Sequence, residues 1–404
     1  MAHAALRLFA LALSLLSLLG AICITAFAWL GCRYRERTAH RAAAGAEARF
    51  LVLVPAHNEG RGVVPTLRSL AGARYPRNLL RVVTIADNCS DTTAECARNE
   101  GAAVWERLDP AHPGKGQALA WAMQRAHGLR WDLIAVIDAD SIVCPDFFAR
   151  LDTAYRSLRR KRREAVALQA RYEFRPALAA ETWFQDFSVA SKAAENSFSY
   201  LPRTRLGLVN LIQGNGFALS RAALDRAPFR ASSVVEDAEY AVELALAGVP
   251  VVHVDDAVVS ARMTSRVGDA APQRLRWATG MFALIARSAP RLVRQAFIRR
   301  DWRLLEAAWM MLLTSRVALS FLTGAAMVAA LAAGRPVEGA VAGFLGASVA
   351  LQAIYLWLVL RRSGGPVVGL GTVVRLPAYL GFIGLAQAGA AVGLKRNIWH
   401  RTQR

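Results

Sequence analysis

Apolar residues are concentrated at the two ends of this 404-residue chain, and residues 46–270 between them mix apolar and polar positions as a globular domain does. Residues 5–31 are almost wholly apolar, and a helix needs about 20 such residues to cross a bilayer. A cleaved signal peptide is the alternative, because "AFA" at 26–28 resembles a cleavage site, but signal peptides have an apolar core of only about 7–15 residues. We therefore predict a transmembrane helix over residues 5–31.

The C-terminal apolar region predicts two further spans and one segment that does not cross. The spans are expected within residues 304–333 and from about 337 to 360, joined by a short loop that suits an antiparallel hairpin. Residues 366–394 are also apolar, but Arg375 and Pro377 interrupt them and basic residues flank both ends. Since basic flanks favour the cytoplasmic side, a single crossing would leave one flank on the wrong side. We expect an interfacial or re-entrant segment there, and hence three spans, with four as the alternative.

The net charge of +20 and the 54% content of hydrophobic residues argue against an ordinary soluble protein. A basic chain can bind nucleic acid or an anionic membrane surface. The arginines follow apolar segments, as Arg33, Arg35, Arg37 and Arg41 do, which favours the membrane and no nucleic acid partner. The positive-inside rule then predicts an N-terminus outside the cell and a central domain at the cytoplasmic face of the inner membrane.

Three short apolar runs in the central region predict strands, over residues 50–54, 81–86 and 133–137, and helical stretches separate them. Strand and helix alternation predicts a parallel α/β sheet. Ligands bind such sheets at the carboxyl ends of the strands, where polar residues follow each run. The sequence therefore predicts a nucleotide-type site, although it has no glycine-rich phosphate loop. The polar residues that follow the three strands are His57, Asn58 and Glu59, then Asp87 and Asn88, then Asp138 and Asp140.

The stretch "VIDADS" carries the most direct chemistry, because Asp138 and Asp140 bring two carboxylates to the end of a buried strand. Two like charges at that distance repel each other unless a cation joins them. Oxygen ligands suit Mg²⁺ or Mn²⁺, and such a metal would bridge a diphosphate. The alternative is that one of the two aspartates caps the following helix.

Glu236 and Asp237 form a second acidic pair, at a junction between a loop and a helix. One of them could be a general base, and the alternative is a helix-capping acid. Lys115 lies between glycines at a predicted helix start, where it would contact phosphate or remain a flexible surface lysine. The "GNG" turn at 214–216 lets a substrate approach the backbone, unless it is an ordinary tight turn.

The stretch "QRLRWATG" at 273–280 precedes the second apolar region. On a helix, Gln273 and Trp277 share one face, and Arg276 lies beside it. This face is either a dense binding surface or a basic interfacial helix.

Taken in this order, the motifs resemble those of the membrane-embedded family 2 glycosyltransferases, which include cellulose, hyaluronan and poly-N-acetylglucosamine synthases. The family's "TED" motif reads Val235-Glu236-Asp237 here, so only the acids match. The closing "WHRTQR" is similar to the cytoplasmic tail of some bacterial members. The matching stretches, spread over residues 54–277, are "VPAHNEG", "ADNCSDTT", "GKGQAL", "DAD", "GNG", "VED" and "QRLRW".

The resemblance implies a GT-A fold, which is a Rossmann-like α/β domain in the cytosol, here with flanking transmembrane α-helices. It also implies a UDP-sugar donor and a divalent metal, Mg²⁺ or Mn²⁺, as cofactor. The base would be Asp237, the tryptophan face would support the acceptor sugar, and the arginine would meet the diphosphate. The residues implied for catalysis are Asp237, Gln273, Arg276 and Trp277; for the nucleotide-sugar, Pro55, Glu59, Asp87, Lys115 and Asp138; for the acceptor, Gly214, Asn215, Gly216, Glu236 and Trp277; and for the metal, Asp138 and Asp140.

The expected function is therefore inverting transfer of a sugar from a UDP-sugar to a growing polysaccharide at the inner face of the membrane. The alternatives are single addition to a lipid, such as a polyprenyl phosphate or a ceramide-like or hopanoid-like lipid, and a degenerate transferase that serves as a scaffold. Three spans make a narrow channel for a polymer, so an oligomer or an export partner subunit is also expected. The expected domains are a transmembrane helix with a basic linker over 1–45, the transferase domain over 46–300, and a C-terminal membrane region over 301–404.

Overall fold

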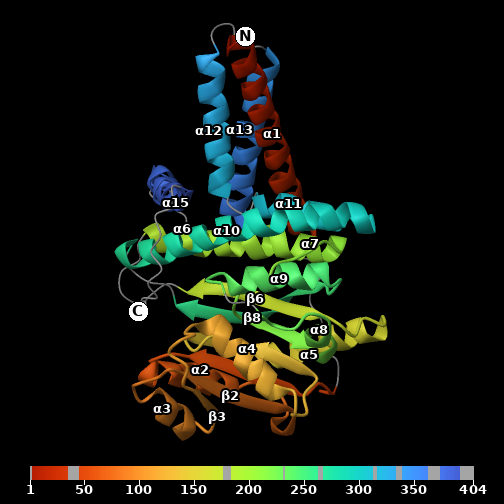
Figure 1. Ribbon diagram of the computed structural model, residues 1–404, viewed down its shortest axis with the longest axis vertical. Helices are drawn as coiled ribbons and strands as arrows, with labels where there is room; N and C mark the ends of the chain where they lie inside the picture. Colours follow the sequence, from red (N-terminus) through yellow and green to blue (C-terminus); the bar gives the residue numbers. More distant parts are fainter. Residues whose placement is uncertain are drawn as a thin grey trace.

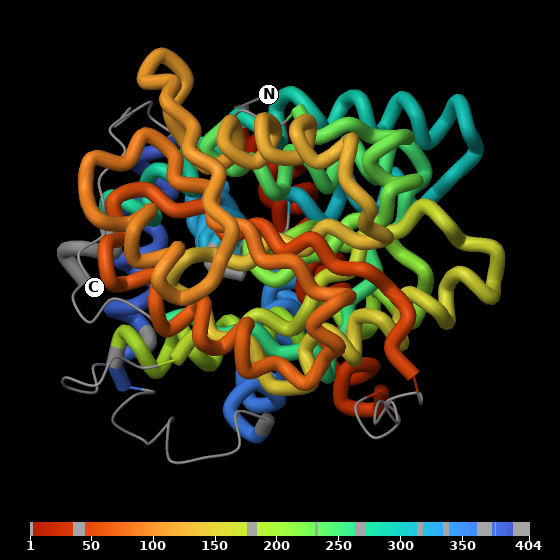
Figure 2. Tube along the Cα trace, turned by 90° about the horizontal axis from the view of Figure 1, so that it is seen from below, coloured from red at the N-terminus to blue at the C-terminus, as the bar shows by residue number. Residues whose placement is uncertain are grey.

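The computed structural model describes residues 2–34, 45–175, 183–230, 233–262, 267–312, 316–333, 339–362 and 374–391. Three layers follow one another along its long axis (Figure 1). An α/β domain forms one end, a layer of transverse helices covers it, and a bundle of three helices forms the other end. Seen along that axis, the bundle lies behind the α/β domain (Figure 2), so the layers are stacked.

The α/β domain is built on one eight-stranded sheet of order β3-β2-β1-β4-β7-β6-β8-β5. The predicted strands are confirmed, and the first extends to Ala56 instead of ending at Pro55. The first four strands of that order are parallel, but β7 and β5 each pair antiparallel with their neighbours. The prediction of a parallel sheet is therefore wrong for the pairings of β7 and β5, whereas β6 and β8 pair in parallel. The alternation of apolar runs and helices does not indicate the direction of each strand. The strands are β1 Phe50–Ala56, β2 Leu80–Asp87, β3 Ala103–Arg107, β4 Leu133–Val136, β5 Ser141–Val143, β6 Ala167–Arg175, β7 Phe217–Ser220 and β8 Val251–Arg262.

Helices cover both faces of the sheet, so its central strands are apolar on both sides. In β1, Phe50, Val52 and Val54 belong to one buried cluster, whereas Leu51 and Leu53 belong to the other. This alternation is the period of two that a strand imposes on its side chains. The first cluster is completed by α2 Val64–Ala71, α3 Thr93–Asn99 and α5 Phe147–Arg160, and the second by α4 Lys115–Ala126, α8 Arg221–Arg226 and α9 Glu236–Leu246.

The transverse layer joins the α/β domain to the bundle (Figure 1). An apolar cluster connects α9 to α10 and α11, with Val242, Leu292 and Met311 among its buried members. A bidentate ion pair reinforces this junction, because Arg203 on α7 donates to Glu306 on α11 at 2.7 and 2.6 Å. The elements of the layer are α6 Trp183–Glu195, the π-helical turn η4 Asn196–Tyr200, α7 Leu201–Leu206, α10 Val267–Arg299 and α11 Trp302–Leu312.

The bundle consists of α1 Ala2–Tyr34, α12 Arg316–Ala332 and α13 Gly339–Arg362. Of the described helices, α1 and α13 are long and apolar enough to cross a membrane, and α12 is a shorter apolar helix. The segment predicted as a span within 304–333 is divided: residues 302–312 form α11, which packs on the α/β domain, and only α12 runs along α1 (Figure 1). The sequence did not reveal this division, because the apolar face that α11 packs against protein resembles part of a transmembrane helix.

The segment predicted as interfacial or re-entrant contains α15 Leu376–Ala391. Figure 1 shows α15 almost end-on, so it runs across the direction of the three bundle helices. It packs against α12, where a side chain at Gly384 would collide with Phe321, and against α6, where Phe187 and Tyr379 stack. Residues 366–373 and 392–394 of the predicted segment and the closing "WHRTQR" lie outside the described residues.

Candidate active site

The carboxyl ends of β1, β2 and β4 meet at one edge of the sheet, as the sequence predicts. The Nδ1 atom of His57, after β1, lies 2.7 Å from the carbonyl oxygen of Asp87, at the end of β2. The side chain of Asn58 accepts a hydrogen bond from the backbone N–H of Ser90 at 2.8 Å. Glu59 follows at the start of a 3₁₀ turn and is partly buried. Pro55 occupies a position of β1 that pairs only with β2, where its missing N–H is tolerated.

Asp87 is held by an arginine that the sequence analysis missed. Arg107, the last residue of β3, donates to Asp87 Oδ1 at 2.6 Å, and both side chains are less than a tenth exposed. A second nitrogen of Arg107 donates to Asp109 at 2.8 Å and to the carbonyl of His112 at 2.9 Å. The position of Arg107, a charged residue at the end of a strand next to the site, could have indicated this role from the sequence. Arg107 fixes the Asp87 carboxylate before any ligand binds.

Lys115 is the first residue of α4, and it is not a flexible surface lysine. Its ammonium group forms an ion pair with Asp138 and donates to the carbonyl oxygen of Gly214 at 2.6 Å. Burial by itself would lower the pKa of Lys115, but the carboxylates of Asp138 and Glu236 outweigh burial and raise it. The lysine therefore carries its charge at neutral pH and connects α4, the end of β4 and the GNG turn.

The GNG turn contacts other residues of the candidate site, so it is more than an ordinary tight turn. Gly214 has φ +74°, and a side chain there would lie 2.9 Å from Asp237 Oδ2, so only glycine fits. The side chain of Asn215 accepts a hydrogen bond from the Asp138 N–H at 3.1 Å and donates to Ser141 at 2.8 Å. Gln169, a buried polar residue in β6 that the sequence analysis missed, donates to the carbonyl of Asn215 at 2.9 Å. At Gly216, φ is +68° and a side chain would collide with Val259.

Glu236 and Asp237 open α9, and the Asp237 side chain faces the GNG turn at Gly214. Burial raises the pKa of Glu236, and the neighbouring Asp237 charge raises it further, to about 7. Burial also raises the pKa of Asp237, while the Ala238 N–H and Lys115 lower it. Asp237 Oδ1 accepts from that N–H at 2.8 Å, so Asp237 satisfies one backbone group of the first helical turn. The pair shares a partly buried negative charge that can accept a proton near neutral pH.

The N-terminal half of α10 carries Gln273, Arg276 and Trp277 past this acidic pair. The helices approach closely at Gly280, where a side chain would lie 2.7 Å from Val234 and 3.0 Å from Val235. Burial lowers the pKa of Arg276, and the Glu236 charge opposes that shift. The Arg276 Nε atom is buried and has no hydrogen-bond partner among the described residues. Gln273 is partly buried.

Trp277 is 38% exposed, and the Arg274 guanidinium lies 5.6 Å from its ring centroid. The indole therefore presents an accessible aromatic surface from the same helix that carries Arg276, which suits the apolar face of a sugar ring.

The carboxylates at the end of β4 could hold a divalent metal only together with oxygen atoms from a bound phosphate compound. Asp138 and Asp140 supply carboxylate oxygens, and the element that follows them is strand β5, so neither aspartate caps a helix. Among the described residues, no group of three or more histidine, cysteine or acidic side chains is arranged to hold a metal by itself. Mg²⁺ is commonly held by one or two carboxylates together with phosphate oxygens, and this donor set has that form.

A family model described as "Glycosyltransferase like family 2" matches residues 48–280, which is more than half of the chain and contains every residue of the site. The chain belongs to this glycosyltransferase family. Its α/β domain accordingly has a GT-A-like fold, with the site at the carboxyl ends of the strands.

Two known proteins illustrate the similarity. The mannosyltransferase PcManGT from Pyrobaculum calidifontis, solved in complex with GDP-Man and Mn²⁺, has a TM-score of 0.57 and is 19% identical, covering 95% of this chain and 99% of its own. This similarity extends the shared fold beyond the α/β domain. "Probable glycosyltransferase YdaM" of Bacillus subtilis (strain 168) is 33% identical over 97 residues, and the chain covers 22% of that relative's length.

Proposed function

We propose that the protein is a metal-dependent glycosyltransferase that moves a sugar from a nucleoside-diphosphate sugar to an acceptor held at the membrane surface. One observation carries this proposal: Lys115 and Asp138 on one side, and Asp237 of the acidic pair on the other, converge on the GNG turn. The first pair suits the diphosphate end of a donor, and the second suits a hydroxyl that must lose its proton. A transferase requires these two functions next to each other.

The reaction assigned to these residues is a single displacement. The acceptor oxygen bonds to the anomeric carbon while the bond from that carbon to the diphosphate oxygen breaks, and the electron pair leaves with the nucleoside diphosphate. The acceptor proton passes to Asp237, whose raised pKa makes it a stronger base than an ordinary aspartate. Attack from the face opposite the leaving group inverts the anomeric carbon. Arg276 contributes positive charge on the leaving side.

The nucleotide is assigned to the edge formed by β1, β2 and β4. Asp87, fixed by Arg107, and the nearby Glu59 would meet the base and ribose, and Pro55 would border them. Lys115 would contact the diphosphate. Asp138 and Asp140 would hold a divalent metal, which supplies Lewis-acid stabilisation of the diphosphate when bound. UDP is the nucleotide that the sequence motifs favour.

The placement at a membrane is supported by the stacked layers. The corner between α10 and α11 exposes Phe297, Ile298 and Trp302, which are 73%, 61% and 64% exposed, and Arg300 and Arg303 lie among them. Exposed apolar side chains next to basic ones are typical of a helix at a lipid headgroup layer. With α1, α12 and α13 in the membrane, the α/β domain would lie at its cytoplasmic face.

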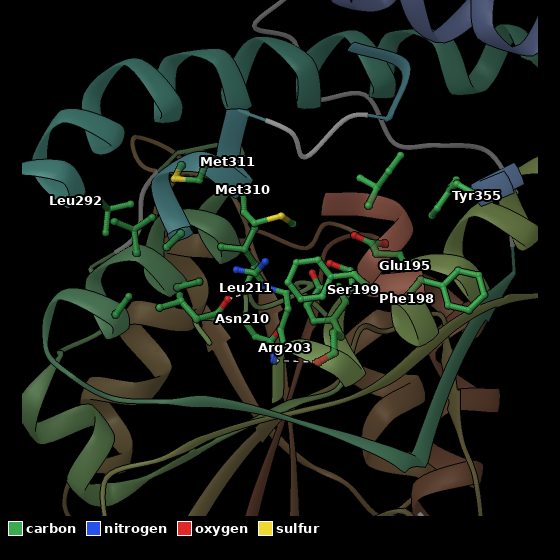
Figure 3. A pocket seen from close by; sticks show the side chains of 18 residues that line it. Glu195, Phe198, Ser199, Arg203, Asn210, Leu211, Leu292, Met310, Met311 and Tyr355 are labelled. Atoms are coloured by element: carbon green, nitrogen blue, oxygen red, sulfur yellow. Dashed lines mark hydrogen bonds between the residues drawn. The ribbon is translucent and has the colours of Figure 1, made fainter. Parts of the chain in front are cut away.

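The acceptor is assigned from the packing of the bundle. The hydroxyl groups of Ser17, Thr323 and Ser348 meet in its buried interior at 2.7 Å, so α1, α12 and α13 are packed against one another at this level. A growing polysaccharide would therefore need a path supplied by a partner subunit or a second copy. A cavity of about 70 Å³ lies beneath the bundle, and Phe27, Phe198, Met310 and Leu292 are among its mostly apolar lining residues (Figure 3). The packed interior of the bundle, and not this small cavity, favours a lipid-anchored acceptor and addition of one sugar.

Membranes containing the protein should therefore be incubated with a panel of labelled UDP-sugars and GDP-sugars, and the products sized. We expect label in a lipid extract, at one sugar per acceptor, that depends on Mg²⁺ or Mn²⁺. A ladder of long water-soluble products would instead support polysaccharide synthesis. Asp237→Asn should abolish labelling, and Asp225→Asn, an exposed acid on α8, is the matched control. Labelling that survives in Asp237→Asn would contradict the assigned base.

A further inference from the structure

Lys115 occupies the position at which a cation is needed in the acidic part of the site. Its ammonium group is paired with Asp138, one of the two carboxylates assigned to the metal. The same charge lies in the field of Glu236 and Asp237, which together with Asp138 raise the pKa of Lys115. One lysine thus neutralises carboxylates from both halves of the site.

The structure limits how the Lys115 ammonium group can move away from Asp138. A second hydrogen bond, to the Gly214 carbonyl at 2.6 Å, ties the ammonium to the GNG turn. The Lys115 backbone opens α4, whose Ala118, Leu119 and Ala122 are buried under the sheet. The lysine can therefore move away from Asp138 by changing its side-chain rotamer but not by moving its helix.

We propose that Lys115 acts as an internal cation that keeps the divalent metal out of the site until a nucleoside diphosphate arrives. A metal at Asp138 and Asp140 would lie beside the ammonium, and like charges in a partly buried site repel strongly. A diphosphate removes this conflict, because its oxygens attract Lys115 away from Asp138 and add ligands for the metal. Nucleotide and metal therefore bind with positive coupling, and Lys115 transmits it. This inference rests on the proposed function.

The coupling can be measured without any sugar transfer. Binding of Mn²⁺ to the purified full-length protein in detergent should be measured by electron paramagnetic resonance of free Mn²⁺, with and without UDP. In the wild-type protein we expect UDP to tighten Mn²⁺ binding by about tenfold or more. In Lys115→Gln, Mn²⁺ should bind about tenfold more tightly than in the wild type when UDP is absent, and UDP should add little.

Two variants serve as controls. Lys115→Arg keeps the charge and should preserve the weak binding of Mn²⁺ alone. Lys161→Gln removes an exposed lysine after α5 and should behave as the wild type does. Asp140→Asn should lose Mn²⁺ binding in every condition.

The outcomes separate this inference from the proposed function. If Lys115→Gln binds Mn²⁺ without UDP no better than the wild type, Lys115 does not exclude the metal and the inference is wrong, although UDP binding and transfer would still support the transferase. If the wild-type protein binds neither UDP nor GDP, with or without Mn²⁺, the proposed function itself fails and the inference fails with it.

Discussion

The two halves of the site differ in how their charged groups are satisfied. On the nucleotide side, Asp87 is paired with Arg107 and Asp138 with Lys115. On the acceptor side, burial raises the pKa of Glu236 and Asp237, and no described residue hydrogen-bonds with the Arg276 Nε atom. The nucleotide half is thus organised before a ligand arrives. The acceptor half holds groups whose protonation or partners must change during the reaction, which is typical of residues that perform chemistry.

Removal of the metal carboxylate should have the largest effect. Asp140→Asn keeps the size of the side chain and removes a negative oxygen ligand, so the metal loses one of its two protein carboxylates. Because a divalent metal supplies several kcal/mol of stabilisation to a leaving diphosphate, transfer should fall by about a hundredfold or more. Initial rates at saturating Mn²⁺ and Mg²⁺ measure this. Full activity at either metal would mean that Asp140 is not a ligand.

Breaking the ion pair between Arg107 and Asp87 on the nucleotide side should affect both the stability of the fold and nucleotide binding. Arg107→Gln leaves the Asp87 carboxylate buried without its partner, which should lower the free energy of unfolding by about 3 kcal/mol and weaken nucleotide binding. Arg98→Gln breaks an exposed ion pair with Glu106, which precedes Arg107 in β3, and should cost less than about 1 kcal/mol. Denaturant titration of both variants gives the comparison. If both variants lost the same free energy of unfolding, the Arg107–Asp87 pair would be no more important for stability than the exposed Arg98–Glu106 pair.

The acidic pair should make transfer sensitive to pH. The Asp237 base must be ionised, and burial raises its pKa. Because Asp237 and Glu236 share the protons that the pair takes up, the rate should be constant at alkaline pH and fall as the pH decreases through the range in which the pair is protonated. In Glu236→Gln the apparent pKa should be lower, because Asp237 no longer competes with a second buried charge. A flat profile between about pH 5.5 and 8 would contradict the coupling.

Trp277 should make the smallest contribution, because it stacks on the acceptor without charge. Trp277→Ala should raise the KM for the acceptor by about fivefold, corresponding to about 1 kcal/mol. The affinity for UDP should not change. Trp302→Ala, at the exposed corner between α10 and α11, is the matched control and should leave the acceptor KM unaltered. A larger effect on UDP than on the acceptor would assign Trp277 to the nucleotide side.

The sequence predicted the strands next to the site and the order of its polar residues, because short apolar runs that end in Asp or Asn are visible locally. It could not predict the partners that organise them. The charged end of β3 marks Arg107 in "WERLD" as a residue near the site, but neither this stretch nor "ALQARYEFR", which contains Gln169, indicates the partner. The sheet brings Arg107 to Asp87 and Gln169 to Asn215. Strand direction in the second half of the sheet and the separation of α11 from α12 likewise depend on tertiary packing.

The division of the site into two halves is the central claim, and a pair of isosteric variants tests it most directly. UDP affinity by calorimetry and transfer rate should be measured on the same preparations of Asp87→Asn and Asp237→Asn. We predict that Asp87→Asn weakens UDP binding while transfer at saturating donor survives. Asp237→Asn should bind UDP almost normally and transfer at least about a hundredfold more slowly. If Asp237→Asn retains transfer, as a helix-capping acid would allow, or if both variants lose binding and transfer together, the account is contradicted.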